Sequence, residues 1–148
     1  MARLNSITIE NYRSISGPLE IKFPVRKPLI LIGENNAGKS NIIRAIDLLF
    51  GEYWPGNKTL EDHEHWQRKS SNTVFLNTDV SEFKVQVRAG YGSSSISGFT
   101  WQFDGKNTDY KAIASDTGQE AYVNNDLRGE LTSLIVSADQ NLAYQLSY

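Results

Sequence analysis

The chain has 148 residues and a mass of 16.6 kDa, which fits one soluble domain, with 39% hydrophobic and 22% charged residues. It contains no cysteine, which excludes a disulfide framework and a cysteine-ligated zinc site. The formal net charge of −2 gives no overall basic field for nucleic acid, although residues 1–45 hold seven Lys and Arg against three Asp and Glu.

The sequence contains no run approaching the about 18 to 20 apolar residues that a membrane helix needs. The first residues, MARLNSITIENY, also lack the apolar core of a signal peptide. We therefore expect a cytoplasmic protein without a membrane partner.

Two short segments near the start alternate apolar and polar residues. In SITIE the apolar positions are Ile7 and Ile9, and in LEIKF they are Leu19, Ile21 and Phe23. This period of two predicts two half-buried strands, and the intervening SISG predicts the turn between them.

The next segment is apolar without alternation. Residues 29–32 read LILI, which predicts a central strand covered on both faces. After a glycine-containing turn, apolar residues recur at helical spacing, and Gly51 stands where a C-cap glycine is expected. The predicted helix has about three turns and an apolar stripe of Ile42, Ile43, Ala45, Ile46, Leu49 and Phe50.

Strand patterns return after a polar connection at 52–72. FKVQV alternates through Phe83, Val85 and Val87, and FTWQF alternates through Phe99, Trp101 and Phe103. Asp104-Gly105 after the second pattern is a strong hairpin signal, and GYGSSSISG between the two patterns predicts a flexible loop. We predict an antiparallel meander, followed by a short helix within 124–131 and a buried strand at 134–138.

The turn between the apolar block and the helix reads GENNAGKS and matches GxxxxGK(S/T), the phosphate-binding loop. Glycines let successive backbone N–H groups point inward at an anion, and the helix that follows adds the positive end of its dipole. Lys39 is expected to reach the β- and γ-phosphates of a nucleotide, and the Ser40 hydroxyl to ligate Mg²⁺. The predicted nucleotide-binding residues of this segment are Gly33, Asn35, Asn36, Ala37, Gly38, Lys39, Ser40 and Asn41.

ITIENYRSI followed by LILIGENNAGKSNIIRAIDLLFG resembles the opening of the SMC, RecF and OLD-like ATPases, whose heads are ABC-type domains. The matching features are Tyr12-Arg13-Ser14 after the first strand, and Asn36 and Asn41 around the loop. The resemblance is close over residues 4–51 and architectural beyond them. It implies an α/β fold: a P-loop strand and helix at 28–51, an antiparallel sheet at about 73–112, and a strand entering a glutamine loop at 131–141.

The resemblance also implies ATP as the nucleotide and a role for Arg13 facing the nucleotide or DNA. An ABC-type head further needs an LSGG-type signature and a Walker B strand ending in Asp-Glu, and the sequence contains neither. Asp139 follows an apolar block, but Gln140 stands where the catalytic Glu is expected. In the family a glutamine at such a place senses Mg²⁺, so the resemblance makes Gln140 a candidate metal contact beside Ser40.

The sequence therefore predicts residues 1–148 to be the first lobe of a split ATPase head, either excised or completed by another polypeptide. The expected partners are a nucleotide, a second lobe or a head-to-head homodimer, and DNA through the complete protein. The expected function is ATP binding in DNA repair, maintenance or phage defence, with negligible hydrolysis and weak or no DNA binding by this lobe alone. The alternatives are a free-standing small P-loop NTPase or kinase using Asp139, and a non-catalytic nucleotide-binding module.

Two further clusters have simpler explanations. Asp62-His63-Glu64-His65 offers four potential metal ligands, but the histidine spacing matches no helical zinc motif, and a solvated loop is the better interpretation. The aromatic residues around Trp101 are a possible stacking platform for single-stranded nucleic acid, but their alternation favours the core of a sheet.

Overall fold

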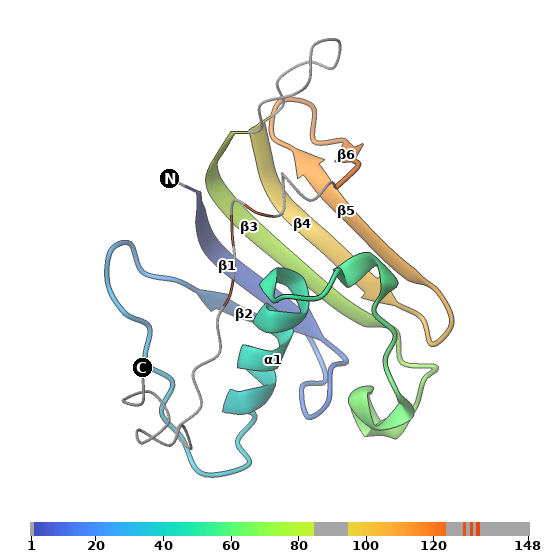
Figure 1. The fold of residues 1–148 in the computed structure, drawn as a ribbon. Coiled ribbons are helices and arrows are strands. Elements are labelled where there is room, and N and C mark those ends of the chain that lie inside the picture. Colours follow the sequence, from blue (N-terminus) through green and yellow to red (C-terminus); the bar gives the residue numbers. More distant parts are fainter. Residues whose placement is uncertain (1, 85–94, 124–128, 130, 132, 134–148) are drawn as a thin grey trace, which may run out of the picture.

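A six-stranded sheet forms the body of the fold (Figure 1). The computed structural model describes residues 2–84, 95–123, 129, 131 and 133. The predicted helix within 124–131 falls mostly outside these residues, and Val85, Val87, residues 90–94, the strand at 134–138, Asp139 and Gln140 fall wholly outside them. The strands are β1 (Arg3–Glu10), β2 (Leu19–Lys22), β3 (Val74–Lys84), β4 (Ser95–Phe103), β5 (Thr108–Ala114) and β6 (Glu120–Ala121).

The strand order is β2-β1-β3-β4-β5-β6, and every neighbouring pair is antiparallel. The two N-terminal strands and the meander, predicted separately, thus join into one sheet because β1 pairs with β3. Ile9 is in register with Leu76 of β3, so alternate residues of both strands face the same side. The predicted hairpin at Asp104-Gly105 connects β4 to β5 and is confirmed.

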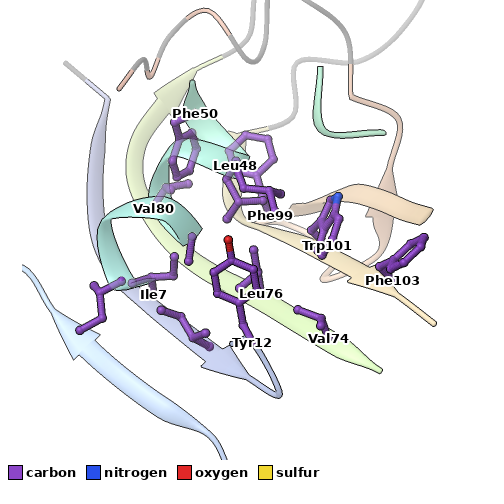
Figure 2. Packing of buried hydrophobic residues seen from close by; sticks show 14 of the residues in the cluster. Ile7, Tyr12, Leu48, Phe50, Val74, Leu76, Val80, Phe99, Trp101 and Phe103 are labelled. Carbon is purple, nitrogen blue, oxygen red and sulfur yellow. The ribbon is translucent and has the colours of Figure 1, made fainter. Parts of the chain in front are cut away.

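One face of the sheet is covered by α1 (Lys39–Phe50), and Figure 2 shows the buried side chains gathered between them. The helix and its C-cap at Gly51 are confirmed. The ring of Phe50 meets Phe99 of β4 edge to face at 5.9 Å between centroids. Trp101 is buried and donates its indole N–H to the carbonyl oxygen of Pro55 at 2.9 Å, so its predicted place in the core is confirmed.

The connection at 52–72 contains three short 3₁₀ helices, η1 (Pro55–Asn57), η2 (Asp62–Glu64) and η3 (Trp66–Arg68). Figure 1 shows this green segment beside α1 and next to the sheet. No helix in the described ranges is long and apolar enough to cross a membrane.

The predicted strand at residues 29–32 is wrong. No strand is assigned there, and Ile30 and Ile32 are 72% and 91% exposed. The apolar run signals a segment suited to burial, but the sheet that the described residues form ends at β2 and gives this segment no neighbouring strand. Ile43 on α1, predicted within the apolar stripe, is likewise 45% exposed.

Because Ile32 is so exposed, we expect Ile32→Lys to leave the free energy of unfolding of this chain within about 0.5 kcal/mol of the wild-type value. Urea denaturation measures this difference. The control is Ile9→Lys, which places a charge at a fully buried position and should cost several kcal/mol. A comparable loss in Ile32→Lys would show that residues 29–32 are buried in the folded chain after all.

Ser95 to Gly98, predicted as part of a flexible loop, instead begin β4. Gly98 is opposite Asp79 of β3, and the ladder is irregular on both sides of β4 here. The Thr78 hydroxyl accepts a hydrogen bond from the Phe99 N–H at 3.0 Å and lies 3.3 Å from the Phe99 carbonyl oxygen, to which it donates. The Thr78 hydroxyl thus bonds to the backbone groups of Phe99 at the point where the register of the strands shifts.

Candidate nucleotide-binding site

The turn before α1 has the curled backbone that a phosphate-binding loop needs. Asn36 and Gly38 both have positive φ, 70° and 93°, and Gly38 is the N-cap residue of α1. Gly38 also lies close to Ser14, whose Oγ would be 3.1 Å from an added Cβ. A side chain at this position is therefore opposed by both backbone conformation and space.

The N-terminus of α1 is open to an anion. No side chain caps it, and its first turn contains no acidic residue. The first backbone N–H groups of a helix have no partner within the helix, and the helix dipole makes this end positive. The chemistry of this end thus fits a phosphate group.

Lys39 lies folded over the loop. Its Nζ donates hydrogen bonds to the carbonyl oxygens of Gly33, at 2.5 Å, and of Glu34, at 2.6 Å. These contacts hold the ammonium group against the backbone of the loop instead of extended into solvent. A positive charge is thereby placed beside the open helix terminus.

The turn after β1 packs against the end of this loop. Asn41 of α1 donates its side-chain amide to the Ser14 hydroxyl at 2.8 Å, which joins the predicted Tyr12-Arg13-Ser14 segment to the helix. Ser14 thus lies beside Gly38 and bonds to Asn41, which brings together segments separated by more than twenty residues. The role of Arg13 toward a nucleotide stays a prediction.

Arg13 is engaged by two side chains. Its Nη2 pairs with Glu64 Oε1 at 2.9 Å, and its Nε donates to the Tyr12 hydroxyl at 3.3 Å. Burial lowers the pKa of Arg13, but Tyr12 and Glu64 outweigh this, and the pKa of the guanidinium is raised overall. Burial raises the pKa of the Tyr12 hydroxyl, against the opposing effect of Arg13.

The segment around η2 supports this turn from the other side. The backbone N–H of Trp66 donates to the carbonyl oxygen of Asn11, and the backbone N–H of Arg13 donates to the carbonyl oxygen of Glu64, both at 2.9 Å. His65 is buried, with Nδ1 2.8 Å from the Asn72 carbonyl oxygen and its ring against Phe103. A carbonyl accepts only, so Nδ1 carries the proton here. His65 thus packs as a core residue.

The four potential ligands at 62–65 do not converge. His63 contacts Glu61 at 3.2 Å, whereas His65 faces the core. In the ranges that the structure describes, no group of three or more acidic, His or Cys side chains is placed to hold a metal ion.

Sequence reasoning did not identify Glu64 as a partner of the site. The residue was part of a charged cluster, and its contact with Arg13 spans 51 positions. The capping box that Glu61 and Glu64 form is a local signal, but it does not reveal the arginine.

A family described as an AAA ATPase domain matches residues 3–142. The chain belongs to this family. The AAA ATPase domain is 25% identical over 159 residues to an OLD nuclease of Thermus scotoductus, covering 97% of this chain and 28% of the relative.

A second relative is the DNA replication and repair protein RecF of Rickettsia canadensis. It is 42% identical over 93 residues, covering 55% of this chain and 24% of RecF. The AAA ATPase domain thus spans less than a third of the length of these relatives.

Two solved structures share the fold. A RecF–ATP structure matches with a TM-score of 0.53 and 19% identity, over 85% of this chain and 29% of that one. A chain from a study of ATP-driven dimerization and DNA-stimulated activation of SMC ATPases matches with a TM-score of 0.57 and 12% identity, over 98% of this chain and 91% of that one. The predicted resemblance to an SMC, RecF and OLD-like ABC-type ATPase lobe is confirmed, and so is the α/β fold class with its antiparallel sheet.

Proposed function

We propose that this AAA ATPase domain binds ATP with Mg²⁺ as the N-terminal lobe of a cytoplasmic ATPase that acts on DNA in repair, maintenance or phage defence. The observation that carries the proposal is the uncapped start of α1 at the left-handed Gly38, with Lys39 folded over the preceding loop. Family membership and the RecF–ATP neighbour support ATP as the ligand. The names of the OLD and RecF relatives support a task on DNA.

The loop residues divide the work by their chemistry. Backbone N–H groups between Gly33 and Asn41 surround the phosphates, and Lys39 neutralises the β- and γ-phosphate charge. The Ser40 hydroxyl would hold Mg²⁺, which would help to neutralise the phosphate charge. Gln140, which lies outside the described residues, is proposed as a further magnesium contact, and Arg13 as a contact of the nucleotide.

The exposed apolar residues at 29–32 support the proposal that this chain is one part of a larger ATPase head. Long apolar side chains such as Ile30 and Ile32 are seldom left together in solvent unless another surface covers them. The partner we propose is a second lobe, on the same or another polypeptide, or a second copy of the head. The proposed DNA surface belongs to the complete protein, because this lobe has a net charge of −2.

The alternatives of a free-standing small P-loop enzyme and of a non-catalytic module are not favoured. The family match extends over residues 3–142, and both curated relatives are much longer than this chain. We expect negligible hydrolysis by this lobe alone, because positioning the attacking water needs groups that we place in the partner lobe.

Calorimetric titration with ATP, in the presence and absence of Mg²⁺, tests the proposal. We expect ATP binding that Mg²⁺ strengthens, and Ser40→Ala should abolish most of that Mg²⁺ effect, about tenfold in affinity. Ser71→Ala removes a hydroxyl from another exposed position and is the matched control. No detectable ATP binding by the folded wild-type chain would contradict the proposal, as would a Mg²⁺ effect that Ser40→Ala leaves intact.

A further inference from the structure

The ion pair between Arg13 and Glu64 is the least exposed of the ion pairs in the described part of the chain. The two side chains are 23% and 17% exposed, whereas every side chain in the other ion pairs there is at least 37% exposed. Screening by water and salt is weaker for such a pair than for a surface pair. Any other anion that binds the Arg13 guanidinium therefore competes with its attraction to Glu64.

This pair lies next to the phosphate loop. Ser14, whose Cα is about 3.8 Å from that of Arg13 along the chain, lies beside Gly38 and accepts a hydrogen bond from Asn41. Asn41 directly follows Ser40, the residue whose hydroxyl would hold Mg²⁺ and so bring its charge beside the phosphates of ATP. The backbone of Arg13 is thus anchored next to the phosphate loop, near Ser40 and Asn41.

A guanidinium pairs with a carboxylate or with a phosphate through the same donors. Arg13 already uses Nη2 for Glu64 and Nε for Tyr12. A phosphate that pairs with this edge of the guanidinium has to displace the Glu64 carboxylate. Where the terminal phosphate takes this same edge, its binding and the ion pair oppose each other.

We propose that Glu64 is a positioning residue that holds Arg13 in a resting place and makes it available only to a ligand that carries a γ-phosphate. The inference rests on the proposed nucleotide site and deepens it by naming what sets the preference between ATP and ADP. Glu64 acts through Arg13 and does not touch the nucleotide.

The backbone around the pair allows the side chains to exchange partners without separating the two segments. Two backbone hydrogen bonds join the segments without involving the guanidinium. One runs from the Arg13 N–H to the Glu64 carbonyl oxygen, and the other from the Trp66 N–H to the Asn11 carbonyl oxygen. Glu64 also accepts the Glu61 N–H through Oε2 at 3.0 Å, and the single oxygen of a glutamine can keep that bond. Glu64→Gln therefore removes the charge and leaves the local fold in place.

The test measures the affinities of ATP and ADP, both with Mg²⁺, for four proteins: the wild type, Glu64→Gln, Arg13→Ala and the double variant. We expect Glu64→Gln to tighten ATP binding about five- to tenfold and to change ADP binding less than about twofold. In the Arg13→Ala background, Glu64→Gln should no longer change the ratio of the two affinities. Glu61→Gln, which removes a nearby carboxylate that pairs with His63, is the matched control and should leave the ratio unchanged.

The possible outcomes separate the two proposals. If the folded wild type binds neither nucleotide, the proposed function fails and the inference fails with it. If the wild type binds ATP but Glu64→Gln leaves the ATP-to-ADP ratio unchanged or lowers it, the inference alone is wrong. It is also wrong if Glu64→Gln raises the ratio equally with and without Arg13, or if Glu61→Gln reproduces the change, because a general charge effect then explains it. Thermal unfolding of each variant confirms that the proteins compared are folded.

Discussion

Replacing Gly98 by alanine is expected to destabilise the chain by about 3 kcal/mol or more. A Cβ on Gly98 would lie 2.1 Å from the carbonyl oxygen of Thr78, and this neighbour is backbone in the adjacent strand. Relief of the clash requires β3 and β4 to separate where the Thr78 hydroxyl bridges to Phe99. Both strands carry the buried face that packs on α1, so the core loosens with them.

Urea denaturation of Gly98→Ala and wild type measures the difference. Gly17→Ala is the matched control, because Gly17 has ordinary φ and no atom within 4 Å of an added Cβ. We expect that control to be neutral or to stabilise the chain by a few tenths of a kcal/mol, since alanine restricts the unfolded chain. An equal effect of the two substitutions would mean that β3 and β4 do not approach as closely as described.

The elements predicted correctly are those whose burial follows from a periodic pattern. In α1 the spacing of Ala45 and Leu49 places both on the face that packs on the sheet. In β4 the alternation of Phe99, Trp101 and Phe103 places all three in the core. A period reports which side of an element is buried, whatever covers it.

The segments predicted wrongly depended on contacts that local sequence does not contain. At 29–32 the continuous apolar run indicated burial, but burial requires a neighbouring strand, which the described residues do not provide. At Ser95 to Gly98 the serine and glycine content indicated a loop. The close approach of Thr78, twenty positions earlier, makes glycine suitable for a strand here.

The candidate site shows the same division. The phosphate-binding motif consists of eight consecutive residues, so Gly38 and Lys39 could be identified from the sequence alone. The association of Ser14 with Asn41, and of Arg13 with Glu64, joins distant segments and became visible only in three dimensions. These contacts place the turn after β1 between the phosphate loop and the η2 segment. A ligand at the loop is thereby connected to residues that no motif marks.

Lys39→Ala is expected to weaken ATP binding by about two to three orders of magnitude. Hydrogen bonds between charged groups contribute about 1.5–3 kcal/mol each, and every 1.4 kcal/mol corresponds to about tenfold in affinity. Two such bonds, to the β- and γ-phosphates, account for the expected range. The variant also loses the bonds that fold the lysine onto the Gly33 and Glu34 carbonyl oxygens, so the loop becomes less ordered before the nucleotide arrives.

Isothermal titration with ATP and Mg²⁺ measures this loss. Lys106→Ala is the control, because it removes the same charge from an exposed residue in the hairpin turn between β4 and β5 and should leave the affinity unchanged. The Lys39 side chain is partly exposed and bonds only within its own loop among the contacts described, so the unfolding midpoint of Lys39→Ala should stay close to that of the wild type. Loss of binding with an unchanged midpoint assigns the effect to the phosphate contact instead of to misfolding. Equal ATP affinity in the wild type and in Lys39→Ala would remove the phosphate loop from the proposed site, because no other cation of the loop is available to replace the lysine.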